Sequence, residues 1–435
     1  MTLLPANDRP APGQTDRARP TGHDGSRPLH AVLLSGVADA RRLVEPLARA
    51  LDGTGPAILP LDADLPAARI SQLINVFQPS VVMEADGEAT VRSIPPGISA
   101  GLSPGTAVII TTSGSTGEPK GVELSAAALT HSAGASLARV GARPGERWLL
   151  SLPATHVAGV QVLVRSLLSG TDPGLAPAAT AGALAASGCA HLSVVPTQLV
   201  RLLDEPGGAA ALAGFTSVLV GGAAAGATVL DRARAAGINA VTTYGMSETC
   251  GGCVYDGVPL DGVRVRADDE GRLRISGPVL MNRYHRRPDL TRAALDGGEF
   301  VTSDLGSVTD DGRVVLRGRA DDVINTGGHK VIPGEVAAAL SSCPGVREVV
   351  VVGRPDPEWG ERVTAVVVPA DPADPPGLEL LRIHVRETLP RYASPSEVEL
   401  TEAIPVLPSG KPDLAALKKP RTLRQREQSR ARSVN

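Results

Sequence analysis

The sequence predicts an α/β protein of at least two domains, a large N-terminal one and a small α+β C-terminal one. The first observation is the length of 435 residues, which is too great for one compact core. The second is the alternation of short apolar runs with segments of helical character. The third is a loop rich in Gly, Ser and Thr that directly follows one of the apolar runs.

Composition excludes several classes of function. The net charge of −3 provides no overall attraction for nucleic acid. No uninterrupted apolar run is long enough to span a membrane, and the N-terminal region has no apolar signal segment. Cys250 and Cys253 form a C-x-x-C pattern, but there is no second pair to complete a zinc site. We therefore expect a cytoplasmic protein with reduced thiols and no membrane insertion.

The pattern along the chain divides it into a tail, two domains and a second tail. Residues 1–28 are rich in Pro, Asp and Arg and are expected to be disordered. Residues 29–318 form the expected large domain and residues 319–417 the small one. The basic segment 418–435 is expected to be a solvated, disordered end. Within the large domain, 31–34, 80–84 and 107–110 are expected strands, and 39–51 and 125–140 are expected helices, the second capped by Ser125.

A polyphosphate loop is predicted at residues 111–121, Thr-Thr-Ser-Gly-Ser-Thr-Gly-Glu-Pro-Lys-Gly. Its glycines allow backbone N–H groups to turn inward, its hydroxyls add donors, and its lysine adds a mobile positive charge. The residues concerned are Thr112, Ser113, Gly114, Ser115, Thr116, Gly117 and Lys120. The spacing is not that of a Walker A loop. The alternative is a Gly/Ser linker, although a buried strand does not normally precede a linker.

This loop resembles the phosphate loop of the adenylate-forming enzymes, which include acyl-CoA synthetases, peptide-synthetase adenylation domains and beetle luciferase. The resemblance implies ATP and Mg²⁺ as partners of the loop. It extends to several later segments of the chain, in the family order. It therefore implies the fold of that family: a large N-terminal domain with several sheets and flanking helices, and a small mobile α+β C-terminal domain.

Two strand ends resemble the adenine and phosphate motifs of the family. Val218 to Ala223 ends in a turn of small residues, Gly222 and Ala223, which would line the adenine pocket. The alternative is a plain strand-to-helix turn. A second strand, from Ala240, delivers four residues with suitable chemistry: Tyr can stack on a base, Ser can donate to phosphate, and Glu can hold Mg²⁺. These residues are Tyr244, Gly245, Ser247 and Glu248.

The segments after residue 299 resemble the ribose-binding motif and the hinge of the family. The resemblance implies that Asp304 accepts hydrogen bonds from the ribose hydroxyls and that Arg319 contacts the ribose. A solvated turn aspartate is the alternative for Asp304. Asp321 matches the pivot between the domains, and Gly327 and Gly328 would line the passage for the pantetheine arm of coenzyme A.

Leu-Pro-x-x-His-x-x-Gly, at residues 152–159, resembles the family segment whose histidine, here His156, lies at the acyl pocket. Nine residues later, Arg165 interrupts an apolar run, where an unpaired charge is costly. Two interpretations remain open for Arg165: a structural ion pair, or a receptor for a substrate carboxylate, which guanidinium binds in a bidentate manner.

Lys411, in the segment Pro-Ser-Gly-Lys-Pro, resembles the lysine that reaches the α-phosphate during adenylation. The resemblance therefore implies a two-step ligase with Lys411, Glu248 and His156 as catalytic residues. Its substrates would be ATP, coenzyme A and a small carboxylic acid.

The His-to-Arg spacing and the segment Val-Pro-Thr-Gln-Leu resemble the o-succinylbenzoate–CoA ligases of menaquinone biosynthesis. The alternatives are another aryl or short-chain acid–CoA ligase, or a stand-alone adenylation enzyme that loads a carrier protein. A homodimer is left open.

Overall fold

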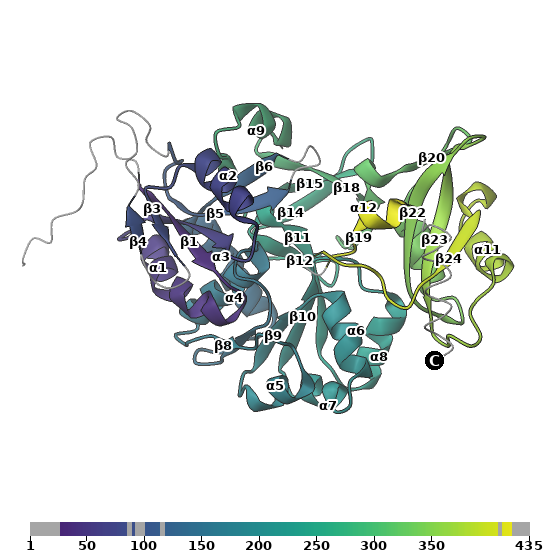
Figure 1. Cartoon of the computed structure of the whole chain (residues 1–435), viewed down its shortest axis with the longest axis horizontal. Helices are drawn as coiled ribbons and strands as arrows, with labels where there is room; N and C mark the ends of the chain where they lie inside the picture. The colour runs from purple at the N-terminus through teal and green to yellow at the C-terminus, as the bar shows by residue number, and fades with distance from the viewer. Residues whose placement is uncertain (1–26, 85–88, 92–100, 114–117, 408–410, 420–435) are drawn as a thin grey trace, which may run out of the picture.

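The computed structural model describes residues 27–84, 89–91, 101–113, 118–407 and 411–419 (Figure 1). The expected tails therefore lie almost wholly outside the described residues, as do Gly114, Ser115, Thr116 and Gly117 of the phosphate loop. The described chain has the predicted α/β architecture, with several sheets, flanking helices and a small C-terminal domain.

The first sheet carries the strands on both sides of the phosphate loop. Seven described strands form it, in the spatial order β16 (Arg283–Tyr284), β6 (Pro119–Ser125), β5 (Thr106–Ser113), β2 (Ala57–Asp62), β1 (Leu29–Leu34), β3 (Val81–Met83) and β4 (Ala89–Val91). β1 is parallel to β2 and β3, and β2 is parallel to β5, whereas β5 and β6 form an antiparallel pair around the loop.

The second sheet lies beside the first and delivers the other nucleotide motifs. Its seven described strands follow the order β13 (Val258–Pro259), β12 (Gly251–Tyr255), β11 (Ala240–Met246), β10 (Ser217–Gly221), β9 (His191–Val194), β7 (Trp148–Leu150) and β8 (Gly174–Leu175). β11, β10, β9 and β7 are parallel neighbours, so their carboxyl ends meet at one edge. Parallel sheets commonly bind ligands at this edge.

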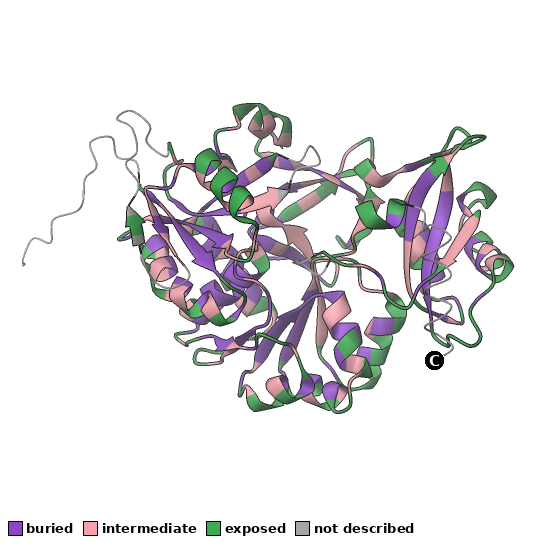
Figure 2. Cartoon of the chain, in the orientation of Figure 1, coloured by how far each residue is buried: buried purple, intermediate pink, exposed green. Residues whose placement is uncertain are grey.

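Three helices share one core with both sheets: α1 (Arg41–Asp52), α3 (Ala126–Arg139) and α4 (Val157–Leu168). α3 begins as predicted, because the Ser125 side chain accepts a hydrogen bond from the backbone N–H of Ala128. Successive residues of a strand face opposite sides, and both faces of β1 are covered: Val32 belongs to the shared core, and Leu33 to a separate cluster with α2 (Ala67–Phe77). Figure 2 shows the resulting burial of the central strands.

Further helices cover the outer face of the second sheet, where they form a separate apolar cluster with its strands. They are α5 (Ala181–Ala186), α6 (Pro196–Asp204), α7 (Gly208–Ala213) and α8 (Ala227–Ala235). The four short 3₁₀ turns of the described chain are η1 (Ala38–Ala40), η2 (Ser247–Thr249), η3 (Ala320–Asp322) and η4 (Arg391–Ala393).

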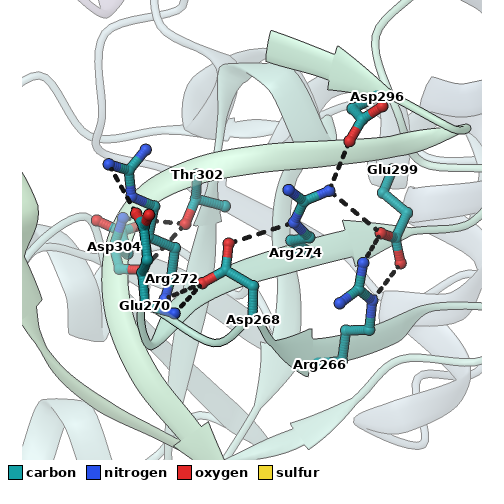
Figure 3. A network of polar contacts seen from close by, with 9 residues as sticks. All are labelled: Arg266, Asp268, Glu270, Arg272, Arg274, Asp296, Glu299, Thr302 and Asp304. Carbon is teal, nitrogen blue, oxygen red and sulfur yellow. Dashed lines mark hydrogen bonds and ion pairs between the residues drawn. The ribbon is translucent and has the colours of Figure 1, made fainter. Parts of the chain in front are cut away.

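A third sheet connects the large domain to the C-terminal part. Its described strands are β14 (Arg264–Ala267), β15 (Arg272–Ser276), β18 (Glu299–Val308), β17 (Leu295–Asp296) and β19 (Val314–Arg319), with α9 (Pro288–Ala294) packed beside them. Figure 3 shows the charged network on this sheet, in which Arg274 bridges Asp268 and Asp296. These ion pairs join β15, the turn before it and β17. The network therefore helps to hold the strand that carries Asp304.

The C-terminal part is built on a fourth sheet. Its described strands are β21 (His329–Val331), β20 (Ile324–Thr326), β23 (Gly360–Pro369), β22 (Val346–Asp356) and β24 (Glu397–Leu400). α10 (Pro333–Leu340) and α11 (Leu378–Arg386) cover one face and α12 (Leu414–Lys418) the other. The position of α12 matters for the site because the chain passes Lys411 immediately before entering this helix.

Candidate active site

The predicted motifs converge on one cavity of about 750 Å³. It opens where the carboxyl ends of the second sheet face β5, β6, the third sheet and the segment before α12. The predicted site residues among its described lining are Thr112, Lys120, His156, Arg165, Gly222, Gly245, Ser247, Glu248, Arg319, Asp321 and Lys411. Ala223, Tyr244, Asp304, Gly327 and Gly328 are not among the described lining residues. Nothing is described of the side chain of Ser113.

The strands on either side of the phosphate loop bring Thr112 and Lys120 together, because these residues are register partners in the β5–β6 pair. Behind them, Gly121 has no room for a side chain: an added Cβ would lie 2.3 Å from the Phe77 ring. The last glycine of the predicted loop is therefore required by packing against α2. The Lys120 ammonium lies 5.7 Å from the centroid of the Tyr284 ring, within the range of a cation–π contact.

Small residues bring the ends of β10 and β11 close to the cavity. A Cβ on Gly221 would lie 2.1 Å from Thr243 Oγ1, and one on Gly245 would lie 2.0 Å from the Gly251 carbonyl oxygen. Gly222 adopts a left-handed conformation, with φ of +86°. Larger residues would separate these strands, so the flat turn that the sequence predicts depends on the glycines.

Glu248 follows β11 and is held by a hydrogen bond that the sequence did not predict. The Tyr284 hydroxyl donates to Glu248 Oε1 at 2.7 Å. Burial and the negative charge of Glu248 raise the pKa of Tyr284 well above its usual range, so the phenol remains a donor. The described residues contain no group of three or more His, Cys, Asp or Glu side chains that could hold a metal ion by themselves. A single carboxylate nevertheless fits Mg²⁺ that arrives with ATP, since Mg²⁺ is often bound by one carboxylate and the substrate phosphates.

Asp304 is buried at the edge of the cavity, and both of its carboxylate oxygens have partners. Oδ2 accepts from the Tyr244 hydroxyl at 2.7 Å, and Oδ1 accepts from Arg319 Nη1 at 3.0 Å. Arg319 also pairs with Asp321 at 3.2 Å. The predicted ribose and hinge residues thus form one connected group, although ribose hydroxyls would have to share Asp304 with these donors.

His156 lies at the N-terminus of α4 and is partly buried. Packing explains the glycine at the end of the segment from Pro153 to Gly159, because a Cβ on Gly159 would lie 2.3 Å from the Pro153 carbonyl oxygen. Gly159 therefore lets the first turn of α4 close against the preceding segment. Burial, assisted by the positive charge of Lys411, lowers the pKa of His156 below its usual value. The imidazole is neutral at neutral pH.

Arg165 lines the cavity and forms no ion pair with any described residue. It is 5% exposed, and three hydroxyl groups accept from it: Ser136 at 3.0 Å, Ser193 at 3.2 Å and Tyr255 at 3.5 Å. The centre of its guanidinium group lies 4.2 Å from the centroid of the Trp148 ring. The buried Nε has no hydrogen-bond partner among the described residues.

The structure therefore does not support an ion pair for Arg165 within the described chain. Burial lowers the pKa of Arg165, while Tyr255 opposes that shift; arginine nevertheless remains charged in proteins. Neutral hydroxyls and an aromatic face hold this cation, so its charge is available to an anion that enters the cavity.

Lys411 reaches the cavity from the C-terminal part of the chain. Its backbone carbonyl accepts from Leu407 N at 2.8 Å, and Val406 and Pro412 form a β-bridge. Asp413 then caps α12 through the N–H of Ala416. These contacts hold Lys411 at the cavity, whose described lining also includes Lys120 and Glu248.

Gly327 and Gly328 form the turn between β20 and β21, away from this cavity. Both have positive φ angles, +56° and +82°, and a Cβ on Gly327 would lie 2.4 Å from the Trp359 ring. Their role in the coenzyme A passage therefore stays a prediction, whereas Lys411 lines the cavity.

Sequence reasoning missed the residues that hold the predicted ones in place. Tyr284 lies on a two-residue strand, and no local pattern distinguishes it. Ser136, Ser193 and Tyr255 come from three separate elements whose hydroxyls meet around Arg165, and Ser136 and Tyr255 also share a hydrogen bond at 2.7 Å. One signal in the sequence pointed to such partners. Arg165 interrupts an apolar run, and burying its charge is costly unless polar groups surround it.

Two further sequence observations concern cysteine and the membrane. Cys250 and Cys253 are buried and free, and burial raises the pKa of Cys253 to about 12. In the described part of the chain, no helix combines the length and apolar character that crossing a bilayer requires.

Comparisons with known families and proteins agree with this geometry. The family described as AMP-binding enzyme matches residues 102–285, and the AMP-binding enzyme C-terminal domain matches residues 335–411. A probable 2-succinylbenzoate–CoA ligase from Mycobacterium tuberculosis is 46% identical over 322 residues, which cover 72% of this chain and 83% of the relative. A 2-succinylbenzoate–CoA ligase from Listeria monocytogenes is 30% identical over 322 residues, which cover 70% of this chain and 68% of the relative.

Among solved structures, a variant of MenE from E. coli with bound OSB-AMS is 25% identical. It has a TM-score of 0.73 and covers 90% of this chain and 87% of its own. The matches to both family domains, together with the curated relatives, establish the family. The chain belongs to the AMP-binding enzymes, the family of the AMP-forming CoA ligases.

Proposed function

We propose that this protein is an o-succinylbenzoate–CoA ligase, which converts o-succinylbenzoate, ATP and coenzyme A into o-succinylbenzoyl-CoA, AMP and diphosphate. The observation that carries the proposal is Arg165, a buried cation without a described counter-charge that lines the same cavity as Lys411. A dicarboxylate supplies the missing negative charge with one acid group and presents the other for activation. The sequence relatives named above support the same substrate.

In the first step, an oxygen of the substrate carboxylate attacks the α-phosphorus of ATP. A new O–P bond forms, the bond from the α-phosphorus to the bridging oxygen breaks, and diphosphate leaves. The carboxylate is already anionic near neutral pH, so no general base is required. Lys411 would neutralise charge at the α-phosphoryl group, while Lys120 and the loop donors would bind the leaving diphosphate.

Mg²⁺ bound with ATP would shield the charge of the triphosphate. Glu248 would hold the Mg²⁺ ion. His156, neutral and beside Lys411, would line the acyl pocket without adding a second positive charge there.

In the second step, the sulfur of coenzyme A attacks the acyl carbonyl carbon, the thiol proton passes to solvent, and AMP leaves with the electrons of the broken C–O bond. We propose that the small domain turns near Asp321 between the steps. The turn would withdraw Lys411 and bring Gly327 and Gly328 to the site. A rearrangement of this kind lets one cavity serve both half-reactions.

The test is a coupled assay of AMP release with ATP, Mg²⁺ and coenzyme A, comparing o-succinylbenzoate with benzoate, salicylate and short fatty acids. A strong preference for o-succinylbenzoate that depends on coenzyme A is the expected result. Preference for another acid would refute the substrate and retain the reaction class. Formation of an acyl-adenylate that coenzyme A does not consume would favour a carrier-protein acceptor.

Lys411→Ala separates the two steps. We expect adenylation to fall by roughly 10²–10³-fold, the size of effect seen when one charge-stabilising donor is lost. Thioester formation from preformed acyl-adenylate should be largely retained. Equal loss in both steps, measured by single-turnover quenching, would contradict the assigned role.

A further inference from the structure

Tyr284 occupies a place between the two halves of the predicted triphosphate site that none of the assigned roles uses. Its hydroxyl donates to Glu248 Oε1 at 2.7 Å, and the Lys120 ammonium lies 5.7 Å from the centroid of its ring. The residue is 7% exposed and lines the cavity. One side chain therefore contacts both the carboxylate placed to hold Mg²⁺ and the lysine placed to bind phosphate.

The strand that carries Tyr284 is anchored on its other face by a buried carboxylate. Tyr284 pairs with Val122 in the β16–β6 register, so its two neighbours point away from the cavity. Both neighbours contact Glu123 Oε1, Arg283 Nε at 3.1 Å and His285 Nδ1 at 2.8 Å. Glu123 itself is fully buried. These contacts fix β16 against the strand that emerges from the phosphate loop.

Backbone hydrogen bonds restrict the same segment further. Met281 N donates to the Glu248 carbonyl oxygen at 2.8 Å, and His285 N donates to the Gly121 carbonyl oxygen at 2.7 Å. The segment 281–285 thus contacts the Glu248 turn at one end and the end of the phosphate loop at the other. A rigid link of this kind sets the separation between Glu248 and Lys120.

The hydrogen bond determines the role that the hydroxyl can have. The Tyr284 hydroxyl donates to Glu248 Oε1 and so occupies one oxygen of that carboxylate. The second oxygen of Glu248, Oε2, accepts no hydrogen bond from any described residue and remains available for a metal ligand bond. Groups that hydrogen-bond a metal-binding carboxylate orient it, and their loss typically weakens metal binding about 10- to 100-fold.

We propose that Tyr284 is a positioning residue for magnesium–ATP: its hydroxyl orients Glu248 toward the metal, and its ring supports Lys120 at the phosphates. The inference rests on the proposed function only in taking ATP as the substrate, and it is independent of which acid is activated.

The test measures ATP binding by calorimetry, with no acid or coenzyme A present, once with Mg²⁺ and once with EDTA. Tyr284→Phe removes the hydroxyl and keeps the ring, so the affinity in Mg²⁺ should fall by about tenfold, while the affinity in EDTA stays unchanged. Tyr284→Leu removes both groups and should weaken binding under both conditions. An unchanged Mg²⁺ dependence in Tyr284→Phe would overturn the inference.

Controls separate positioning from a general structural effect. Tyr392→Phe makes the same change at an exposed tyrosine of the small domain, stacked on His329, and should alter neither affinity. In a Glu248→Gln background, Tyr284→Phe should have no further effect on the Mg²⁺ dependence; a full, additive effect there would refute the link through Glu248. Equal weakening in Mg²⁺ and EDTA by Tyr284→Phe, with a lowered melting temperature, would also refute it.

The result is distinguishable from a failure of the proposed function. If o-succinylbenzoate is not the substrate, only the AMP-release assay changes, because the binding experiment contains no acid. If Tyr284 has no positioning role, acid preference remains as proposed while the Mg²⁺ dependence of ATP binding is insensitive to the hydroxyl.

Discussion

Arg165 in the large domain and Arg354 in the small domain are both buried, with exposed fractions of 5% and 3%, yet their surroundings are opposite. Arg354 donates to Glu399 Oε2 at 2.7 Å and to the Leu417 carbonyl oxygen at 2.8 Å. It also lies 3.6 Å from Glu397. Arg165 has only hydroxyls and an aromatic face. The contrast indicates which buried charge the fold itself requires. Arg354 joins two strands to α12, whereas Arg165 pairs with no described carboxylate.

The strongest test of this contrast is Arg165→Met. Removal of one partner of a buried charge pair typically costs about 2–5 kcal/mol in binding, so we expect a loss of roughly 10²–10³-fold in kcat/KM for o-succinylbenzoate. Activity with benzoate should change little. The free energy of unfolding should stay equal or rise, because methionine removes an uncompensated charge. Equal loss for both acids, or marked destabilisation, would make Arg165 a structural residue.

Arg354→Met should have the reverse outcome. It leaves Glu399 and Glu397 without their buried cation, which costs about 3 kcal/mol of the unfolding free energy. Denaturant unfolding, followed by fluorescence, measures the loss. Arg347→Met, at a half-exposed position of the same strand, is the matched control and should change stability by about 0.5 kcal/mol or less. Similar losses of unfolding free energy in Arg354→Met and Arg347→Met would show that buried and surface ion pairs contribute equally to stability.

Glu123 extends the comparison to a buried negative charge that has hydrogen-bonding and positively charged partners. Its pKa predicts that the stability of the fold depends on pH. Burial alone would raise its pKa, but hydrogen bonds from His285 and Ser103 and the charge of Arg283 lower it to about 2. A carboxyl with a lowered pKa stabilises the fold above its ordinary pKa and loses that contribution on acidification.

Glu123→Gln should therefore cost about 2 kcal/mol at pH 7. The difference from wild type should shrink as the pH falls below about 4.5. Denaturant unfolding at several pH values checks this. A difference that is independent of pH would show that shape, and not charge, accounts for the role of Glu123.

The smallest expected effect concerns one of the three hydroxyl groups that accept hydrogen bonds from Arg165. Ser193→Ala removes the acceptor of Arg165 Nη2 and should raise KM for o-succinylbenzoate severalfold, corresponding to about 1 kcal/mol. Ser166→Ala is a suitable control, because its buried hydroxyl donates to Val162 within α4. If Ser193→Ala and Ser166→Ala change KM for o-succinylbenzoate by the same factor, the hydroxyls around Arg165 do not orient it for substrate.

Features that depend on local chemistry could be predicted from the amino-acid sequence alone. Ser125 caps α3 because a short hydroxyl side chain reaches an N–H three residues away, and the buried run from Ala107 to Ile110 forms a strand. The cost of a charge in an apolar run also identified Arg165 without any knowledge of its partners. In each case the determining contacts lie within a few residues, or are a matter of burial alone.

How these features meet in space depends on the tertiary fold and could not be predicted locally. The hydroxyls around Arg165 lie 28 to 90 residues away in sequence, and Tyr284 lies 36 residues from Glu248. No local spacing encodes such pairs, because strand order and crossover connections set them. The same reason explains why Gly327 and Gly328 lie outside the cavity while Lys411 lies within it: the orientation of the small domain determines which of its segments reaches the site.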